Sequence, residues 1–253
     1  MNINTPLAQP DYLMPLVLHK IVKDNPIAWE DISENVFIKL IDVIGPSCVL
    51  IHQDQTPQSN GWCLTFDDGN VSDYEIVFPI LRDRGVVGVF FLIAEKVGKD
   101  GYLNWSQIAE MSRNGMKFGS HSLSHRDMTS LAKKEVWAEF TDSKSLLEDK
   151  IGIEITSFSY PYGCCSKKLN RTCFAAGYKF SFTSNHGFAN KSSSVIPRNS
   201  INSNMGWPDV LSILDPKMST RLHWYLEDNS KNLIKSLIGR ERYIKLRDKM
   251  LYE

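Results

Sequence analysis

The chain lacks an excess of charge of either sign, since its 253 residues include 29 lysines and arginines and 29 aspartates and glutamates. No overall field therefore favours nucleic acid as a partner. Long apolar runs are missing too, and the longest is far too short to span a bilayer. The first residues show no basic region followed by an apolar stretch, so we expect no signal peptide and a cytoplasmic protein.

Cysteine is also scarce, with five residues whose odd number and spacing do not suggest a disulfide framework. Reduced thiols are therefore expected. Two of the five, Cys164 and Cys165, are adjacent. Adjacent cysteines chelate one ion poorly, so we expect a structural role for them. The length allows one domain of barrel size or two small ones.

Strand and helix signals alternate along the chain. Runs typical of strands cover residues 13–18, 62–66, 86–93, 116–120, 158–160, 180–183 and 195–197. Helical patterns cover residues 33–44, 73–84, 105–113, 131–151 and 167–176. Repeated strand-then-helix units predict parallel strands joined by right-handed crossovers. About seven such units fit an α/β fold of the distorted, incomplete (β/α)7 barrel type.

His121 and His125 follow one of these strands and are four residues apart. Such a pair can present two imidazoles to one point, on a helical turn or around a tight loop. A carboxylate from elsewhere in the fold would complete a His-His-Asp set, which suits a zinc-like divalent ion with open positions for water. Taken alone, the pair is more often two surface or core histidines.

Asp67 and Asp68 end another apolar strand, residues 62–66. At a strand end both carboxylates can reach one site, so one could bind metal while the other handles a proton. Taken alone, this Asp-Asp-Gly sequence is typical of a solvated turn. A third motif, residues 159–163, also follows a strand. Three special motifs placed after strands are typical of a β/α enzyme that builds its site from loops.

The ordered trio TFDDG, HSLSH and SYPYG resembles the polysaccharide deacetylases, the NodB-homology fold of the fourth carbohydrate esterase family. This resemblance covers roughly residues 10–205 and implies metal-dependent removal of N-acetyl groups by a NodB-like barrel. It implies that Asp67 is the catalytic base. It also implies that Asp68, His121 and His125 bind one divalent ion, most commonly zinc.

The third motif departs from the family pattern. The resemblance implies that the backbone N–H of Tyr162 helps to form an oxyanion hole. The arginine usual in this motif is replaced by Ser159. Arg198 follows a late strand and is our candidate for the missing arginine that orients Asp67. A surface salt-bridge residue is the alternative interpretation of Arg198.

The general acid also departs from the pattern, because the family usually has a late histidine and His223 here has helical flanks. His19 instead ends the first apolar strand, which is similar to the permuted branch that includes poly-N-acetylglucosamine deacetylases. We predict that His19 protonates the leaving nitrogen, since imidazole has an ordinary pKa of about 6.5. A half-buried histidine bonded to backbone is the alternative, and His52 and His186 are rival acids.

The resemblance implies an N-acetylated sugar, glycan or glycoconjugate as substrate. A catalytically silent NodB-like binding or scaffold protein is a second hypothesis, supported only by the changed third motif. A hydrolase of a small non-sugar amide is a third hypothesis.

The last part of the chain lies outside the resemblance. We expect residues 1–215 to form the barrel and residues 216–253 to form an amphipathic helical extension packed on it. Seven lysines and arginines fall within residues 231–253, interleaved with apolar residues. The pattern favours helices with a basic outer face over contact with a membrane surface.

Overall fold

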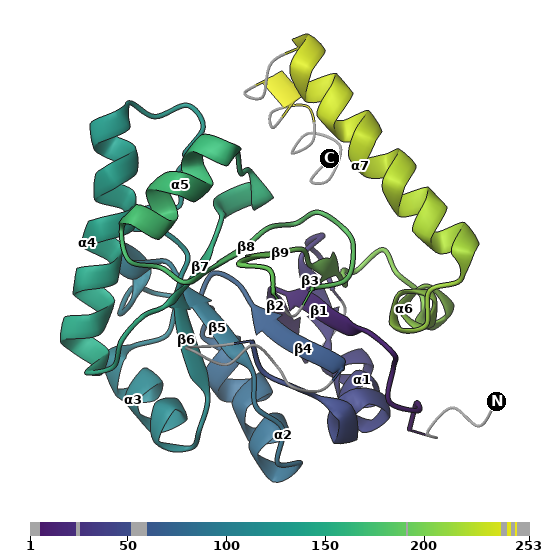
Figure 1. Cartoon of the computed structure of the whole chain (residues 1–253). Helices are drawn as coiled ribbons and strands as arrows, with labels where there is room; N and C mark the ends of the chain where they lie inside the picture. The colour runs from purple at the N-terminus through teal and green to yellow at the C-terminus, as the bar shows by residue number, and fades with distance from the viewer. Residues whose placement is uncertain are drawn as a thin grey trace.

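A computed structural model describes residues 6–23, 26–51, 60–190 and 192–238, together with 242, 243 and 246. Eight strands form the main sheet (Figure 1): β1 (Leu13–Leu18), β4 (Gly61–Phe66), β5 (Val89–Leu92), β6 (Lys117–Ser120), β7 (Ser157–Ser159), β8 (Phe180–Phe182), β9 (Val195–Ile196) and β10 (Asn199–Ser200). Their order is β10-β1-β4-β5-β6-β7-β8-β9, and neighbouring strands are parallel. This confirms the predicted incomplete barrel.

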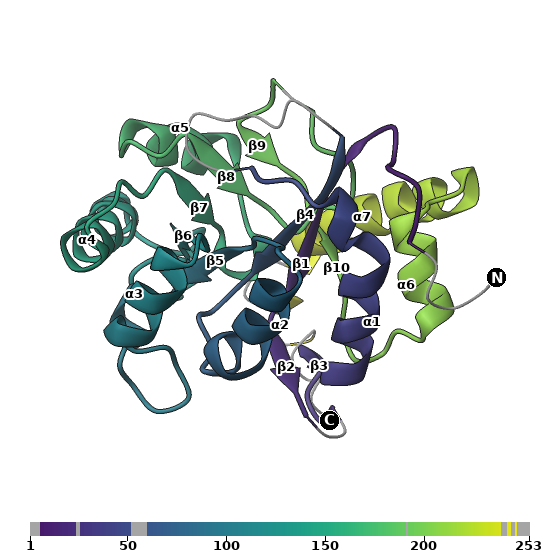
Figure 2. The ribbon, with the colours of Figure 1, turned by 90° about the horizontal axis from the view of Figure 1, so that it is seen from below.

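Five helices cover the outside of the curled sheet (Figure 2): α1 (Glu34–Ile44), α2 (Phe78–Asp83), α3 (Trp105–Arg113), α4 (Lys133–Ile151) and α5 (Lys167–Ala175). Local chemistry sets their ends. The side chain of Ser33 accepts the N–H of Val36 and caps α1. Gly152, with φ of 78°, ends α4 in the left-handed conformation that suits glycine.

The core has two parts, one on each face of the sheet. Between the sheet and the helices, Phe66, Phe90 and Phe118 stand at neighbouring positions of β4, β5 and β6. The rings of Phe66 and Phe90 are stacked with centroids 4.7 Å apart. A second buried cluster, which includes Phe91 and Phe182, lies apart from the first. Strand alternation explains the division, since Phe90 and Phe91 point to opposite faces.

Several elements differ from the prediction. The helix expected over 73–84 begins as a π-helix (Asp73–Val77) and continues as α2. Short β2 (Lys20–Val22) and β3 (Asp31–Ser33) form a separate two-stranded sheet that was not predicted. Strand β10 and helix α6 (Trp207–Leu214) were also missed. Strands of two or three residues are too short to show a period.

The sheet ends at β9 on one side and β10 on the other, although only Pro197 and Arg198 separate these strands in the chain. Three peptide links therefore connect Ile196, the last residue of β9, to Asn199, the first residue of β10. Their Cα atoms are at most about 11 Å apart. The barrel is thus nearly closed at this seam, and Arg198 lies in it.

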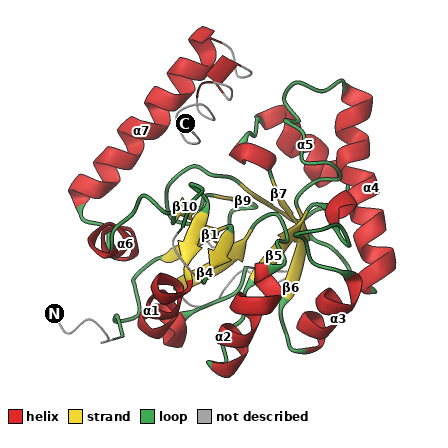
Figure 3. Ribbon diagram, turned by 180° about the vertical axis from the view of Figure 1, so that it is seen from behind, coloured by secondary structure: helices red, strands yellow, loops and turns green. Residues whose placement is uncertain are grey.

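Helix α7 (Met218–Ile238) follows α6 and extends away from the barrel (Figure 3). It contacts the rest of the fold through Trp224, which is 7% exposed and whose ring stacks on His186 with centroids 5.6 Å apart. The helix lies within the segment 216–253 that was expected to be helical. Most of 239–253 lies outside the described residues. In the described ranges, we find no helix with the length and apolar character needed to cross a membrane.

Candidate active site

Backbone strain is concentrated in the three predicted motifs. Four non-glycine residues of the described chain have positive φ: Asp68 at 78°, Ser122 at 67°, His125 at 63° and Tyr162 at 58°. Each lies in a loop directly after β4, β6 or β7. The Cβ atom makes this conformation costly for any residue except glycine, and such strain often accompanies function. The fold therefore maintains an unusual geometry at these three loops.

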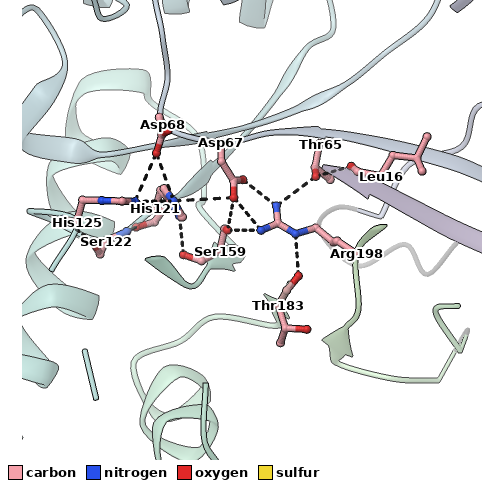
Figure 4. A network of polar contacts seen from close by, with 11 residues as sticks. Leu16, Thr65, Asp67, Asp68, His121, Ser122, His125, Ser159, Thr183 and Arg198 are labelled. Atoms are coloured by element: carbon pink, nitrogen blue, oxygen red, sulfur yellow. Dashed lines mark hydrogen bonds and ion pairs between the residues drawn. The ribbon is translucent and has the colours of Figure 1, made fainter. Parts of the chain in front are cut away.

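Asp68, His121 and His125 converge on one point (Figure 4). The Oδ1 atom of Asp68 lies 3.5 Å from the Nε2 atom of each histidine, and the two Nε2 atoms are 3.2 Å apart. Oδ1 of Asp68 is buried and accepts no hydrogen bond from a described residue. Two imidazoles and one carboxylate suit a divalent ion, so the three residues fit a metal ion.

The tautomer of His121 also suits a metal ligand. Its Nδ1 atom lies 2.9 Å from the backbone carbonyl of Ser159, to which it donates. The lone pair is then on Nε2, which faces Asp68 and His125. Burial lowers the pKa of His121 to about 4, although Asp67 acts in the opposite direction. His121 is therefore neutral near pH 7, as metal binding requires.

Glu139 of α4 holds the histidine loop in place. Its carboxylate accepts the backbone N–H groups of Leu123 and Ser124, each at 3.0 Å, and the hydroxyl of Ser124. Burial raises the pKa of Glu139, but the hydrogen bonds from Ser124, Arg126 and Leu123 together outweigh burial and lower it. Glu139 is therefore ionised, and its carboxylate holds the loop that carries the two histidines. The sequence pattern gave no signal for it, since a glutamate on a helix is most often a solvated residue.

Arg198 and Asp67 form a buried two-point ion pair. Nη1 of Arg198 lies 2.7 Å from Oδ1 of Asp67, and Nη2 lies 2.7 Å from Oδ2. The hydroxyl of Ser159 donates to Oδ2 of Asp67 at 3.0 Å and accepts from Nη2 of Arg198 at 2.8 Å. Arg198 is only 1% exposed, so its interpretation as a surface residue is wrong.

The guanidinium has further support on every side. Its Nε atom donates to the carbonyl of Thr183 at 3.0 Å, and Nη1 donates to the hydroxyl of Thr65 at 3.2 Å. It lies over the rings of Phe91 and Phe182, 5.5 and 5.8 Å from their centroids. These contacts fix the plane of the guanidinium and so fix the carboxylate that it binds.

The charge of Arg198 determines the state of Asp67. Burial alone would raise the pKa of Asp67, but the guanidinium and, to a lesser extent, His121 outweigh it and hold the pKa well below its usual range. Asp67 is therefore ionised at neutral pH. A carboxylate with so low a pKa is a weak base. The ion pair with Arg198 therefore fixes the orientation of the Asp67 carboxylate and at the same time lowers its basicity.

Tyr162 lies beside the metal ligands. It occupies the short turn Pro161–Gly163 after β7, is 37% exposed, and places its ring centroid 4.9 Å from that of His125. The predicted role of its backbone N–H as an oxyanion donor stays a prediction.

His19 lies at the same end of the sheet as Asp67. Leu18 pairs with Phe66, and the N–H of Asp67 donates to the carbonyl of Leu18 at 3.0 Å. The next residue, His19, is close enough to contribute to the lowered pKa of Asp67. Its Nδ1 atom is buried without a hydrogen-bond partner among the described residues, so this nitrogen has no bond to the backbone there.

The other histidines have different surroundings. Nδ1 of His186 lies 3.0 Å from Oδ1 of Asp228, so this residue joins a loop to α7. His223 lies on α7 with an exposed side chain, as its helical flanks predicted. His52 lies outside the described residues.

Asp73 is a buried carboxyl that sequence analysis missed. Neither of its oxygens has a hydrogen-bond partner among the residues that the structure describes, although the N–H of Asn70 lies near. Burial raises its pKa well above the ordinary value, and the carboxylates of Asp68 and Asp67 raise it further. It stands at the start of the π-helix, a structure that often occurs at functional sites.

The comparisons with known proteins concern the middle of the chain. The family model for polysaccharide deacetylases matches residues 54–181. The YxkH protein of Bacillus subtilis, which carries the name of a polysaccharide deacetylase, is 27% identical over 56% of this chain and 51% of its own length. A chitin deacetylase of Pestalotiopsis is 29% identical over 47% of this chain and 40% of its own length. This chain thus spans about half or less of these relatives.

Two solved structures share the fold. The deacetylase PplD of Streptococcus pyogenes, in complex with acetate, has a TM-score of 0.71 at 21% identity and covers 84% of this chain and 100% of its own. IcaB from Ammonifex degensii has a TM-score of 0.70 at 22% identity, covering 81% and 98%. The family match includes both aspartates, both histidines and Tyr162, whereas His19 and Arg198 lie outside residues 54–181.

Proposed function

The chain belongs to the polysaccharide deacetylase family, and from this premise we propose that it hydrolyses the N-acetyl group of an amino sugar or glycan and releases acetate. One observation carries the proposal. An oriented carboxylate, Asp67, adjoins a cluster of three ligand atoms that lie within 4.8 Å of one another. Amide hydrolysis needs a base and an electrophile at one place, and this arrangement provides both.

We further propose that Asp68, His121 and His125 hold one divalent ion, with zinc as the expected metal. When bound, this ion would polarise the acetyl oxygen and lower the pKa of the attacking water. Neutral imidazoles and a carboxylate are ligands that zinc accepts readily.

In the proposed reaction the residues of the chain divide the proton transfers between them. Asp67 accepts a proton from the water that attacks the acetyl carbon, while Arg198 and Ser159 keep its carboxylate in position. The backbone N–H of Tyr162 donates to the oxygen that becomes negative. His19 gives a proton to the nitrogen as the C–N bond breaks, so the products are acetate and a free amine.

The substrate remains a proposal at the level of an N-acetylated sugar, glycan or glycoconjugate. The cytoplasmic location expected from the sequence is likewise a prediction. So is contact of the basic C-terminal segment with a membrane surface. The silent-scaffold hypothesis rested on the absent motif arginine, and the ion pair between Arg198 and Asp67 supports an active enzyme instead.

The test is acetate release from a panel of N-acetylated sugars and oligomers, together with metal analysis of the same protein. Asp67→Asn is the control, because it removes the proposed base and leaves the three ligands. Acetate release by the wild-type protein and none by the variant would support the proposal. Equal release by both proteins would overturn the assigned mechanism.

A further inference from the structure

A pocket of about 680 Å³ lies beside the proposed active site, between the first turns of α4 and α5. Its lining includes Trp137, Lys133, Lys168, Ser166 and Asp127. The proposed mechanism uses none of these residues. The volume falls within the range of small-molecule sites, which is about 300–1,000 Å³.

The walls of this pocket continue the two loops that carry the active site. Asp127 follows His125 by two residues, and Ser166 follows Tyr162 by four. At about 3.8 Å per peptide link, Asp127 lies within about 8 Å of His125, and Ser166 within about 15 Å of Tyr162, measured between Cα atoms. The pocket therefore adjoins the loops that carry His125 and Tyr162.

The surfaces of the pocket suit a sugar ring. Trp137 is 45% exposed and offers an apolar face on which the C–H face of a pyranose can stack. The hydroxyl oxygen of Ser166 accepts the N–H of Leu169 at 3.2 Å, so its proton is available for a ligand. An apolar platform with a few hydroxyl groups is the pattern of a carbohydrate site.

The charges of the pocket discriminate between two kinds of sugar unit. Lys133 and Lys168 line it, and neither forms an ion pair with a residue that the structure describes. Asp127 is the single carboxylate among the described lining residues, and one of its oxygens already accepts two bonds from Thr129. The positive ends of two helices add to the field. An acetylated unit is neutral, whereas a deacetylated unit carries an ammonium group that this field repels.

We propose that this pocket is a second sugar subsite, which holds an acetylated unit of the bound glycan and disfavours a deacetylated one. The proposal rests on the function proposed above. The enzyme would then act on stretches that are still acetylated and turn away from its own product.

The first test compares kcat/KM for chitin-derived oligomers of N-acetylglucosamine, from the dimer to the hexamer. Trp137→Ala should lower the hexamer-to-dimer ratio by about fivefold or more. Tyr225→Ala is the matched control, because Tyr225 is an exposed aromatic residue of α7. An unchanged ratio in Trp137→Ala, with acetate still released, would overturn the subsite and leave the proposed function standing.

The second test measures binding in the Asp67→Asn background, so that no turnover interferes. The probes are the fully acetylated and the fully deacetylated hexamer. Adding Lys133→Glu and Lys168→Glu should improve binding of the deacetylated hexamer by about threefold or more, whereas Lys150→Glu, at the other end of α4, should not. If the Lys133→Glu and Lys168→Glu pair improved binding of the deacetylated hexamer no more than Lys150→Glu did, the proposal would be overturned. If wild-type protein released no acetate from any oligomer, the proposed function would fail, and these binding ratios would still decide on the pocket.

Discussion

Arg198 reaches from the seam of the barrel to bind both carboxylate oxygens of Asp67 at 2.7 Å. The residue that replaces the usual motif arginine, Ser159, contacts both partners. A small hydroxyl at position 159 leaves room for a guanidinium that arrives from the segment between β9 and β10. The cation is therefore retained beside the carboxylate, although the segment that supplies it has changed.

Removal of this guanidinium should destabilise the protein. We expect Arg198→Met to lower the free energy of unfolding by about 3–5 kcal/mol, because Asp67 is left buried and unpaired. Asp67 has a lowered pKa in the folded protein, so the pair stabilises the fold above the ordinary carboxyl pKa of about 4. This contribution is lost as the pH falls toward the folded pKa. Urea unfolding at pH 7 and pH 3 measures both effects. A loss of equal size at both pH values would contradict the assignment.

The three proposed metal ligands can be tested without substrate. His121→Ala or His125→Ala should strip the ion while the helical content stays near the wild-type value, since the loop retains its brace from Glu139. Elemental analysis after purification gives the occupancy, and circular dichroism gives the fold. His223→Ala, on α7, is the matched histidine control. Full occupancy in both loop variants would refute the ligand set.

The two adjacent aspartates should separate metal binding from proton transfer. Asp67→Asn is expected to lower turnover by about 100-fold or more and to keep the metal. Asp68→Asn is expected to lose both, since its Oδ1 atom lies 3.5 Å from each ligand histidine. Metal content and acetate release are measured on the same samples. The opposite pattern would mean that the two roles are reversed.

Local strings of sequence predicted the three loops, because each combines a strand end with residues whose chemistry is distinctive. Arg198 could be proposed because the motif lacked an arginine and a late strand preceded a candidate. Glu139 and Ser159 could not be assigned their contacts, since these join segments 15 to 92 residues apart. Such pairs depend on how strands are ordered in the sheet, and residue spacing carries no record of that order.

The irregular elements escaped prediction for a different reason. Helix periodicity over 73–84 does not distinguish an α-helix from the π-helix that begins at Asp73. The two-residue strand β10 has no measurable alternation, and the nearly closed seam between β9 and β10 became visible only in three dimensions.

The contribution of Asp73 to stability should change with pH in the opposite direction to that of Asp67. Its folded pKa is raised, so the folded state holds the proton more tightly than the unfolded state does. Stability from this group is therefore complete below about pH 4 and is lost as the pH rises toward the folded pKa. Asp73→Asn, which stays neutral, should raise Tm at pH 7 and leave it nearly unchanged at pH 4. Thermal melts of EDTA-treated protein measure this, with Asp42→Asn as the exposed control. A Tm difference that does not depend on pH would show that Asp73 does not titrate as inferred.

His19 carries the most demanding prediction, because it lies outside the matched segment 54–181. Amide cleavage needs a donor for the leaving nitrogen, and His19 follows Leu18 at the level where β4 delivers Asp67. His19→Ala should lower kcat by about 100- to 10,000-fold and keep metal content and Tm close to the wild-type values. His223→Ala should change none of these quantities. A substrate with a better leaving group, such as an N-acetyl anilide, should recover much of the lost rate, since its nitrogen needs less protonation. If His19→Ala retains near-normal rates on both substrates, the acid lies elsewhere, and His186 becomes the next residue to replace.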